Sequence, residues 1–287
     1  MSGHGERAHS KFSASGSERW LKCPASVALE EAAPPSIDTF WSKEGTLAHE
    51  VLEKVLARQE FDLPFDVSRE MLEHVNAVAA KIRAIHKASG GVLLFETRVF
   101  ASFIHEEMFG TCDAIIAGAN GILHIVDFKY GAGHVVDAKE NTQLIQYALS
   151  AAESYDWDFT HVSMHIMQPR GGGEWHKRWT ITIKELKEFW LPLWVSGVAR
   201  VERGHNKPFP GSHCHWCRAK NFNCSAKMEM RQEKISNVFE SNPLPKEKIN
   251  HGIKEKSKAK ETSRQVRGQT ARQENEGRQK EKTKSVW

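Results

Sequence analysis

The sequence lacks any apolar run that approaches the roughly 20 residues of a membrane-spanning helix. Its first 17 residues, MSGHGERAHSKFSASGS, contain no apolar stretch of the kind that a secretory signal carries. Cysteine occurs only five times, and the phosphate-binding pattern G-x-x-x-x-G-K-[ST] of many helicases and ATPases is absent. We therefore expect a cytoplasmic protein that is neither membrane-bound nor a helicase, and whose cysteines do not form a disulfide framework.

The composition is that of a soluble globular chain, but its charge is uneven. Of the 287 residues, 40% are hydrophobic and 26% are charged, which allows a sizeable buried core. The last 43 residues hold 13 Lys and Arg and 6 Asp and Glu, a net of +7, so residues 1–244 carry −3 of the formal +4. We predict a flexible N-terminus at 1–11, one folded domain at 12–230 and a basic tail at 231–287 that is disordered or a frayed helix. The tail either holds a polyanion or is only a solubilising end.

The hydrophobic pattern of the domain predicts a mixed α/β fold. Apolar residues at helical spacing predict helices, and short β-branched and aromatic runs broken by Gly and Asn predict strands. The predicted helices are 42–59, 68–86, 139–155 and 184–201. The predicted strands are 91–102, 110–121, 122–131, 160–169 and 175–183. This order favours a mixed β-sheet with helices on its faces.

The most informative segment is an apolar strand that ends in Asp127-Phe128-Lys129. Side chains alternate along a strand, so Asp127 and Lys129 lie on one face and Phe128 points into the core. A carboxylate can hold a divalent cation, and a nearby lysine can stabilise the charge that develops on a phosphate. Taken alone, an Asp-x-Lys pair is more often an ordinary surface pair.

Three further features change this assessment. Asp113 follows Gly110 on the preceding strand, where antiparallel pairing would place it beside Asp127. His49 lies at the edge of the apolar face of an early helix, where it is either a core histidine or directed into a site. Gln143 and Tyr147 lie one turn apart on a later helix, as a pair facing the site or as ordinary surface residues.

Together and in this order, these elements resemble the RecB-like branch of the PD-(D/E)XK nuclease superfamily, which has a helical His, then G-x-x-D, D/E-x-K and Q-x-x-x-Y. The resemblance covers most of the chain and implies a restriction-endonuclease-like mixed β-sheet flanked by helices. The ligands that it implies for Mg²⁺ or Mn²⁺ are His49, Asp113, Asp127 and the Phe128 carbonyl. The catalytic residues that it implies are Asp113, Asp127, Lys129, Gln143 and Tyr147.

The resemblance also implies a function, in which a divalent metal activates the water that hydrolyses a phosphodiester bond. We expect a DNA nuclease, more an exonuclease than an endonuclease, that acts on single-stranded DNA or duplex ends. By analogy, it would serve phage or prophage recombination together with a single-strand annealing protein. The alternative is a non-catalytic nucleic-acid-binding or recombination scaffold protein with a structural metal site.

A second site is indicated by the C-terminal run HCHWCRAKNFNC, which contains Cys214, Cys217 and Cys224. Three thiolates this close in a cytosolic chain indicate a metal or cluster. The RecB-like subset with an iron–sulfur cluster has one N-terminal cysteine and a C-terminal trio. The resemblance therefore implies that Cys23 joins the trio around a structural [4Fe–4S] cluster that links the two ends of the domain. The alternative is Zn²⁺ held by the trio and His213 or His215.

Other conspicuous residues have simpler interpretations. Cys112 is expected to be a small buried side chain. Glu96, on the strand before Asp113, is either an extra acidic residue near the site or structural, and the structural role is favoured. Arg170, in a Gly-rich loop, either contacts a phosphate backbone or is exposed. Trp190 and Trp194, at helical spacing, are expected to belong to the core.

Overall fold

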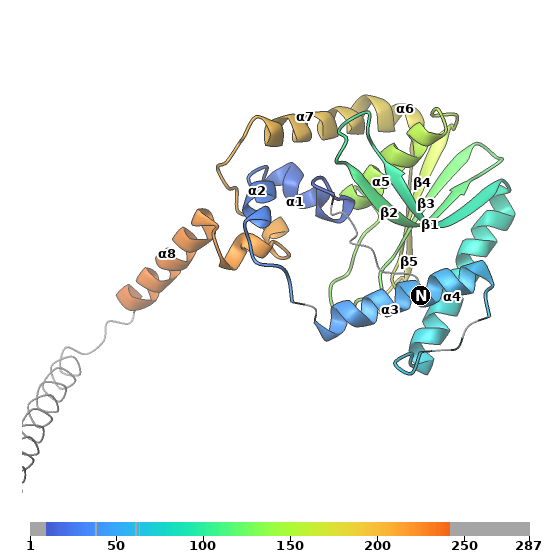
Figure 1. The fold of residues 1–287 in the computed structure, drawn as a ribbon, viewed down its shortest axis with the longest axis horizontal. Coiled ribbons are helices and arrows are strands. Elements are labelled where there is room, and N and C mark those ends of the chain that lie inside the picture. Colours follow the sequence, from blue (N-terminus) through green and yellow to red (C-terminus); the bar gives the residue numbers. More distant parts are fainter. Residues whose placement is uncertain (1–9, 38, 61, 63, 242–287) are drawn as a thin grey trace, which may run out of the picture. The chain divides into compact units, whose positions relative to one another are not determined.

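The computed structural model describes residues 10–241 except 38, 61 and 63. It divides into two units, Met1–Lys227 and Met228–Trp287, of which the first contains the sheet and every candidate site residue (Figure 1). Residues 1–9 of the segment predicted to be flexible and residues 242–287 of the predicted tail lie outside the described residues. Residues 231–241, the described part of that tail, continue helix α8 (Ser225–Ser241).

The core of the first unit is a five-stranded mixed β-sheet in the order β1-β2-β3-β4-β5. All five predicted strands are present, and their bounds are Val92–Phe100, Phe109–Ala117, Ile122–Phe128, His161–Met167 and His176–Thr182. Neighbouring strands are antiparallel except for β3 and β4, which are parallel. The parallel pair requires a crossover, which helix α5 (Thr142–Ser154) provides.

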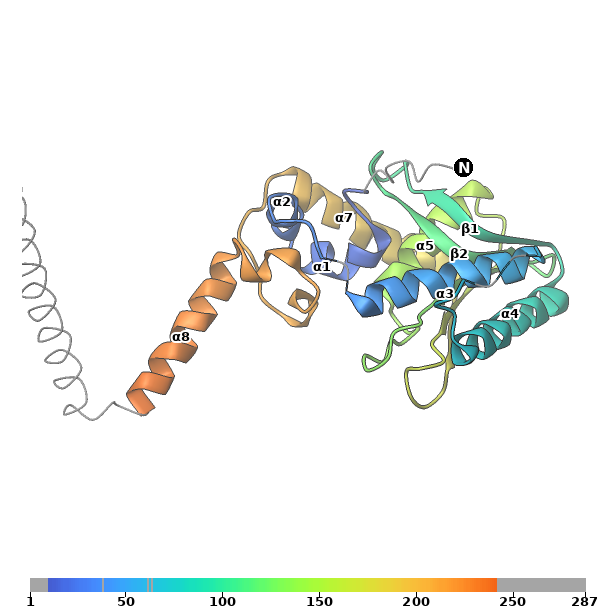
Figure 2. The same ribbon diagram turned by 60° about the horizontal axis from the view of Figure 1, so that its bottom comes forward.

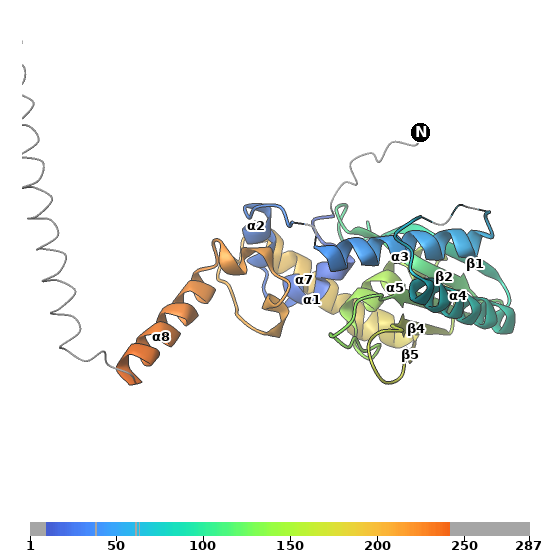
Figure 3. The same ribbon diagram turned by 90° about the horizontal axis from the view of Figure 1, so that it is seen from below.

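Helices cover both faces of this sheet and divide the core in two (Figures 2 and 3). Helices α3 (Phe40–Ala57) and α4 (Arg69–Ser89) pack on one face around Val75, Ile116 and Phe128. Helix α5 and the helical segment 183–202 pack on the other face around Leu144 and Trp194. That segment consists of α6 (Ile183–Glu185), the π-helical η2 (Leu186–Trp190) and α7 (Leu191–Glu202). The prediction of a mixed sheet flanked by helices is thus confirmed.

Capping side chains explain where two of the predicted helices begin. The α3 helix begins two residues before the predicted start, because Thr39 and Ser42 form a reciprocal capping box. The α5 helix begins at Thr142 rather than near Lys139, because the Asn141 side chain accepts a hydrogen bond from the backbone N–H of Leu144. This later start places Gln143 in the first turn of α5, directly after the loop that follows β3.

Short helices that precede and follow the sheet-forming segment in the sequence pack together at one end of the first unit. The N-terminal elements are η1 (Ala14–Gly16), α1 (Ser17–Lys22) and α2 (Ser26–Glu31), and the C-terminal ones are η3 (Ser212–Cys214) and η4 (Arg218–Asn221). Glu30 forms an ion pair with Arg19 at 2.7 Å and accepts a hydrogen bond from the backbone N–H of Arg218 at 2.8 Å. Asn223 donates to the carbonyl of Leu29 at 3.2 Å. None of the helices in the described part of the chain is both long and apolar enough to cross a membrane.

Three histidines form a hydrogen-bonded row across β3, β4 and β5. His124 Nε2 lies 2.8 Å from the Ser89 hydroxyl oxygen. His124 Nδ1 lies 3.1 Å from His165 Nε2, and His165 Nδ1 lies 2.9 Å from His176 Nε2. Each link needs one donor and one acceptor, so a link is lost when both of its rings are protonated at both nitrogens. Burial and the charge of Arg178 lower the pKa of His124 to about 4.

The row makes the stability of the fold sensitive to acid. Burial and the neighbouring His124 and His176 lower the pKa of His165 to about 2, and the cations Lys81 and Arg178 act in the same direction. In the unfolded chain these rings titrate near their ordinary value of 6.5, so the unfolded state binds more protons below that pH. We expect the free energy of unfolding to be highest with respect to these histidines above pH 6.5. It should fall as the pH is lowered toward 4, by up to about 1.4 kcal/mol per pH unit for each histidine.

Urea unfolding of the wild type and of His165→Gln between pH 7.5 and 5 would check this prediction. The substitution should weaken the pH dependence, whereas His161→Gln, at an exposed histidine at the start of β4, should leave it unchanged. An equal pH dependence in the wild type and His165→Gln would contradict it.

Candidate active site and cysteine cavity

Two aspartates from the adjacent inner strands β2 and β3 lie opposite each other where the pairing of these strands ends. Strands β2 and β3 are antiparallel with Ala114 opposite Val126, so the next residues along this register are Asp113 and Asp127. Asp127 is almost fully buried, whereas Asp113 is half-buried. The structure thus brings together the two carboxylates that the sequence predicts to be neighbours.

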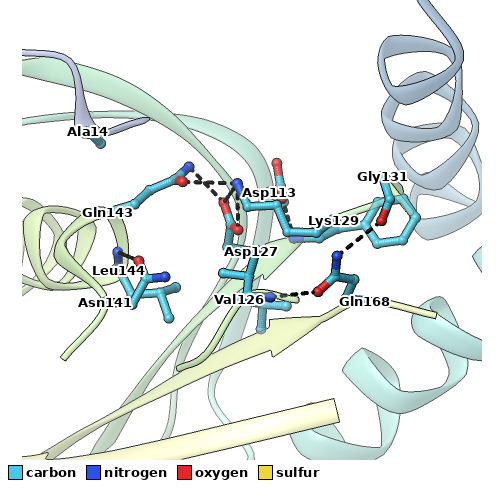
Figure 4. Close-up of polar contacts among 12 residues, drawn as sticks. Ala14, Asp113, Val126, Asp127, Lys129, Gly131, Asn141, Gln143, Leu144 and Gln168 are labelled. Atoms are coloured by element: carbon cyan, nitrogen blue, oxygen red, sulfur yellow. Dashed lines mark hydrogen bonds and ion pairs between the residues drawn. The ribbon is translucent and has the colours of Figure 1, made fainter. Parts of the chain in front are cut away.

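Lys129 and Gln143 complete a polar network around Asp127 (Figure 4). The Lys129 Nζ atom lies 2.9 Å from Asp127 Oδ2 and donates a hydrogen bond to Gln143 Oε1 at 2.9 Å. The Gln143 amide donates to Asp127 Oδ1 at 2.8 Å. Each of the three side chains is therefore held by the other two, with the ammonium at the end of β3 and the amide in the first turn of α5.

Tyr147 lies one turn along α5 and packs closely against the start of β2. Its hydroxyl accepts a hydrogen bond from the Gln143 amide at 3.4 Å. A Cβ atom at Gly110 would lie 2.9 Å from the Tyr147 ring, so only glycine allows this approach. Burial and the charge of Asp127 raise the pKa of Tyr147 well above its ordinary value, so the hydroxyl keeps its proton. The glycine of the G-x-x-D pattern therefore has a packing role.

His49 reaches Asp113 from helix α3, 64 residues earlier in the chain. His49 Nδ1 lies 3.1 Å from Asp113 Oδ1, and the backbone N–H of Phe128 donates to Asp113 Oδ2 at 2.6 Å. The Glu96 carboxylate also lies here: one ligand atom each from His49, Glu96 and Asp113 lie within 4.8 Å of one another. The sequence analysis placed Glu96 near the site but assigned it no role in it.

The charges of these groups depend strongly on one another. Burial raises the pKa of Asp127 and Asp113 adds to this effect, while Lys129 opposes both. Burial acts to lower the pKa of Lys129, but the charge of Asp127, its hydrogen bond and the charge of Asp113 together outweigh burial and raise the pKa, so Lys129 is an ammonium at neutral pH. Burial also acts to lower the pKa of His49, but Asp113, Asp127 and Glu96 together outweigh it and raise the pKa. The site therefore concentrates negative charge that a divalent cation would neutralise.

The loop between Lys129 and α5 is fixed by Gln168, a residue that the sequence analysis did not assign to the site. The Gln168 amide donates to the carbonyl of Gly131 at 3.0 Å (Figure 4). It also donates to the carbonyl of His134 at 2.8 Å and accepts a hydrogen bond from the N–H of Val136 at 2.9 Å. Gln168 is buried at the end of β4, the strand parallel to β3. This role depends on the parallel pairing of β3 and β4, which no local pattern in the sequence shows.

Two weaker expectations have clear outcomes. Arg170 is not simply exposed: it forms an ion pair with Glu44 at 2.8 Å and lies over the Tyr130 ring at 4.9 Å. Trp194 is buried in the core, and the partly buried Trp190 packs against it, as expected.

Four cysteines line one small cavity between the N- and C-terminal helices: Cys23, Cys214, Cys217 and Cys224. The backbone N–H of Phe209 donates to Cys23 Sγ, and that of Gly211 donates to Cys214 Sγ, both at 3.4 Å. The fifth cysteine, Cys112, is fully buried inside β2 and does not line this cavity, as expected. The cavity thus brings Cys23 close to three cysteines that lie about 190 residues later in the sequence.

The surroundings of the cavity are positively charged. Arg19, Lys220 and Lys227 line it with the cysteines. His213 also lines the cavity, and its Nε2 atom lies 2.9 Å from the carbonyl oxygen of Phe209. His215 is exposed and contacts Trp216, so of the two histidines proposed as zinc ligands only His213 faces the cysteines.

Comparison with known proteins gives a match to one family model and similarity to a number of solved structures. The sequence model of the family described as "Protein of unknown function (DUF2800)" matches residues 9–287. A "Putative exonuclease" from Eubacterium rectale is similar over 76% of this chain and 93% of that chain, at 14% sequence identity and a TM-score of 0.44. The protein SSO0001 is similar over 78% of this chain and 89% of that chain, at 12% identity and a TM-score of 0.35. Structural similarity at this level carries no information on activity.

Proposed function

The chain belongs to the DUF2800 family, and we propose that it is a metal-dependent DNA nuclease with a RecB-like PD-(D/E)XK site on a restriction-endonuclease-like fold. One observation carries this proposal: the four separate motifs of the sequence meet in one connected network. His49 contacts Asp113, Asp113 lies opposite Asp127, and Asp127 is held by Lys129 and Gln143. Chance surface pairs would not converge from two helices and two strands.

The donor groups of the site fit a hard divalent cation. We assign His49, Asp113, Asp127 and the Phe128 carbonyl as ligands of Mg²⁺ or Mn²⁺, which prefer carboxylate and carbonyl oxygens and accept imidazole. Asp127 Oδ2 is buried, and its one polar neighbour among the described residues is the Lys129 ammonium at 2.9 Å. Such an oxygen, next to a second carboxylate, is suited to a cation. When bound, the ion would lower the pKa of a water molecule and neutralise charge on the scissile phosphate.

The other residues of the network supply positioning and charge. Lys129, held by Asp127 and Gln143, places an ammonium where negative charge builds up on the phosphate in the transition state. The Gln143 amide forms hydrogen bonds with both members of the ion pair, Asp127 and Lys129, and so fixes the orientation of the Lys129 ammonium. Tyr147 keeps its proton and orients the Gln143 amide from the opposite side. We therefore assign catalytic roles to Asp113, Asp127 and Lys129, with Gln143 and Tyr147 as positioning residues.

The cysteine cavity is proposed to hold a structural [4Fe–4S] cluster. Cys23, Cys214, Cys217 and Cys224 supply the four thiolates, and the two backbone N–H groups that bond sulfur atoms are suited to a cluster's negative charge. A zinc ion held by these cysteines, or by the trio with His213, is the alternative. The cluster would fasten the N-terminal helices to the C-terminal segment and would take no part in hydrolysis.

The biological setting follows from the resemblance to RecB-like nucleases with such a cluster. These mostly degrade DNA from ends, so we propose an exonuclease acting on single-stranded DNA or duplex ends. In phage or prophage recombination, such an enzyme would produce single strands for an annealing protein. The alternative of a non-catalytic nucleic-acid-binding protein predicts binding without turnover.

Removal of divalent ions tests the proposed function. We expect anaerobically purified protein to degrade end-labelled linear DNA with Mg²⁺ or Mn²⁺ and to lose all activity in EDTA, because the carboxylates alone cannot activate water. Excess Mg²⁺ should restore the rate. Activity that is unaffected by EDTA, or binding of DNA without release of nucleotides under any of these conditions, would contradict the proposal.

A further inference from the structure

Glu96 has a backbone conformation that is unusual for its position. It lies in the middle of strand β1, yet its φ angle is +44°. This is the left-handed region of backbone conformation, which residues other than glycine and asparagine rarely adopt. Its neighbours Phe95 and Thr97 pair regularly with Ala114 and Cys112 of β2. The strained residue therefore lies opposite Asp113, with regular pairing on both sides. Backbone strain of this kind persists where the surrounding structure imposes it, and it concentrates at functional sites.

The strain accompanies a break in the alternation of side chains. Residues two apart on a strand should share a face, but Cys112 packs in the core on the α5 side of the sheet and Ala114 in the core on the α3 side. The same holds on β1, where Phe95 packs on the α3 side and Val99 on the α5 side. Both strands thus change faces at the level of Glu96 and Asp113. At this level, the polar side chains of Glu96 and Asp113 belong to neither hydrophobic core.

The break brings Glu96 to His49 and Asp113. One ligand atom each from the three side chains lies within 4.8 Å of the others, and all three residues are half-buried. They come from α3, β1 and β2, so the set has rigid supports. Asp127, in contrast, directs one oxygen to Gln143 and Lys129 and the other to Lys129 alone. Among the described residues, His49, Glu96 and Asp113 form the group whose ligand atoms lie this close together.

We infer that Glu96 is a direct ligand of the divalent ion, together with His49 and Asp113. This inference rests on the proposed function, because it adds a ligand to the same site. A third carboxylate beside Asp113 and Asp127 makes the site more negative and strengthens its preference for a hard cation. It also gives the strained conformation a reason, since the strain holds the Glu96 carboxylate close to the Asp113 carboxylate, which repels it until a cation binds.

Metal binding to Glu96→Gln, without DNA, tests this inference. The full-length protein is freed of divalent ions on a chelating resin, and MnCl₂ is titrated in by calorimetry. We expect the Mn²⁺ affinity of Glu96→Gln to fall by about tenfold or more relative to the wild type. The matched control is Glu50→Gln, which removes the same charge from an exposed position next to His49 in sequence and should bind Mn²⁺ as the wild type does.

Thermal unfolding separates a ligand from a structural residue. Without divalent ions, Glu96→Gln should melt close to the temperature of the wild type, because it removes both the repulsion between Glu96 and Asp113 and the attraction of Glu96 to His49. With Mn²⁺, it should gain less in melting temperature than the wild type does. A lower melting temperature without ions together with a normal gain in Mn²⁺ would assign Glu96 a purely structural role and overturn the inference.

The outcomes distinguish this inference from the proposed function. If the wild type binds Mn²⁺ and cleaves DNA while Glu96→Gln binds with equal affinity, the inference fails and the proposed function stands. If Glu96→Gln loses affinity but the wild type cleaves no DNA, Glu96 is a ligand at a site with another activity, and the proposed function fails. No Mn²⁺ binding by the wild type would overturn both.

Discussion

Replacing Lys129 with methionine is expected to lower the rate of DNA cleavage by about two to three orders of magnitude. Methionine keeps much of the length and apolar volume of lysine but removes the ammonium, and loss of one transition-state donor typically costs this much. The fold should persist, because the Lys129 side chain is partly exposed and Asp127 retains its bond to Gln143. Single-turnover cleavage of end-labelled linear DNA measures the rate, and a binding assay in Ca²⁺ measures affinity.

Lys139→Met is the matched control for this prediction. Lys139 is exposed and lies in the loop before α5, so the substitution removes the same charge near the site without touching the network. It should cleave within about twofold of the wild type, since isolated surface charges have small effects. Equal losses in Lys129→Met and Lys139→Met would indicate that the lysines contribute only general attraction of DNA, and would contradict the assignment of Lys129.

Replacing Cys214 with alanine is expected to remove the bound cluster and to destabilise the domain. When a cofactor binds only the folded state, its binding free energy adds to the free energy of unfolding. A loss of about 4 kcal/mol corresponds to a decrease of about 10 °C in melting temperature for a domain of this size. Soluble yield, iron content and cleavage should fall together, because Cys214 lies where the C-terminal segment meets the N-terminal helices.

Cys112→Ala controls for the loss of a buried cysteine. Cys112 is fully buried in β2, away from the cavity, so its substitution should cost about 1 kcal/mol in packing and leave the iron content unchanged. Iron and acid-labile sulfide in the wild type would support the cluster, whereas zinc without iron would establish the alternative. Normal stability of Cys214→Ala with lost activity would contradict a structural role.

The motifs of the site could be predicted from sequence because each follows from local geometry. Alternation along a strand places Asp127 and Lys129 on one face, and helical spacing places Gln143 and Tyr147 on one side of α5. The antiparallel order of β2 and β3 then brings Asp113 beside Asp127. These relations depend on few residues and on standard periodicities, so the sequence contains them directly.

Other features depend on tertiary structure and could not be read in this way. The contact of Glu96 with His49 and Asp113 requires the left-handed backbone at Glu96, and the break in alternation reverses the face that a regular pattern would assign. The role of Gln168 depends on the parallel pairing of β3 and β4, which the chain makes only through the α5 crossover. Cys23 could be joined to the C-terminal trio only by resemblance, because no local pattern links residues about 190 positions apart.

The most direct test of a metal-dependent exonuclease compares linear with closed-circular DNA. Anaerobically purified wild type and Lys129→Met are incubated with end-labelled linear duplex, single-stranded and covalently closed circular DNA in Mn²⁺. The account predicts that the wild type releases nucleotides from a linear substrate, leaves the closed circle intact and loses this activity with the Lys129 ammonium. No nucleotide release by the wild type from any substrate, with DNA binding equal in the two proteins, would contradict it.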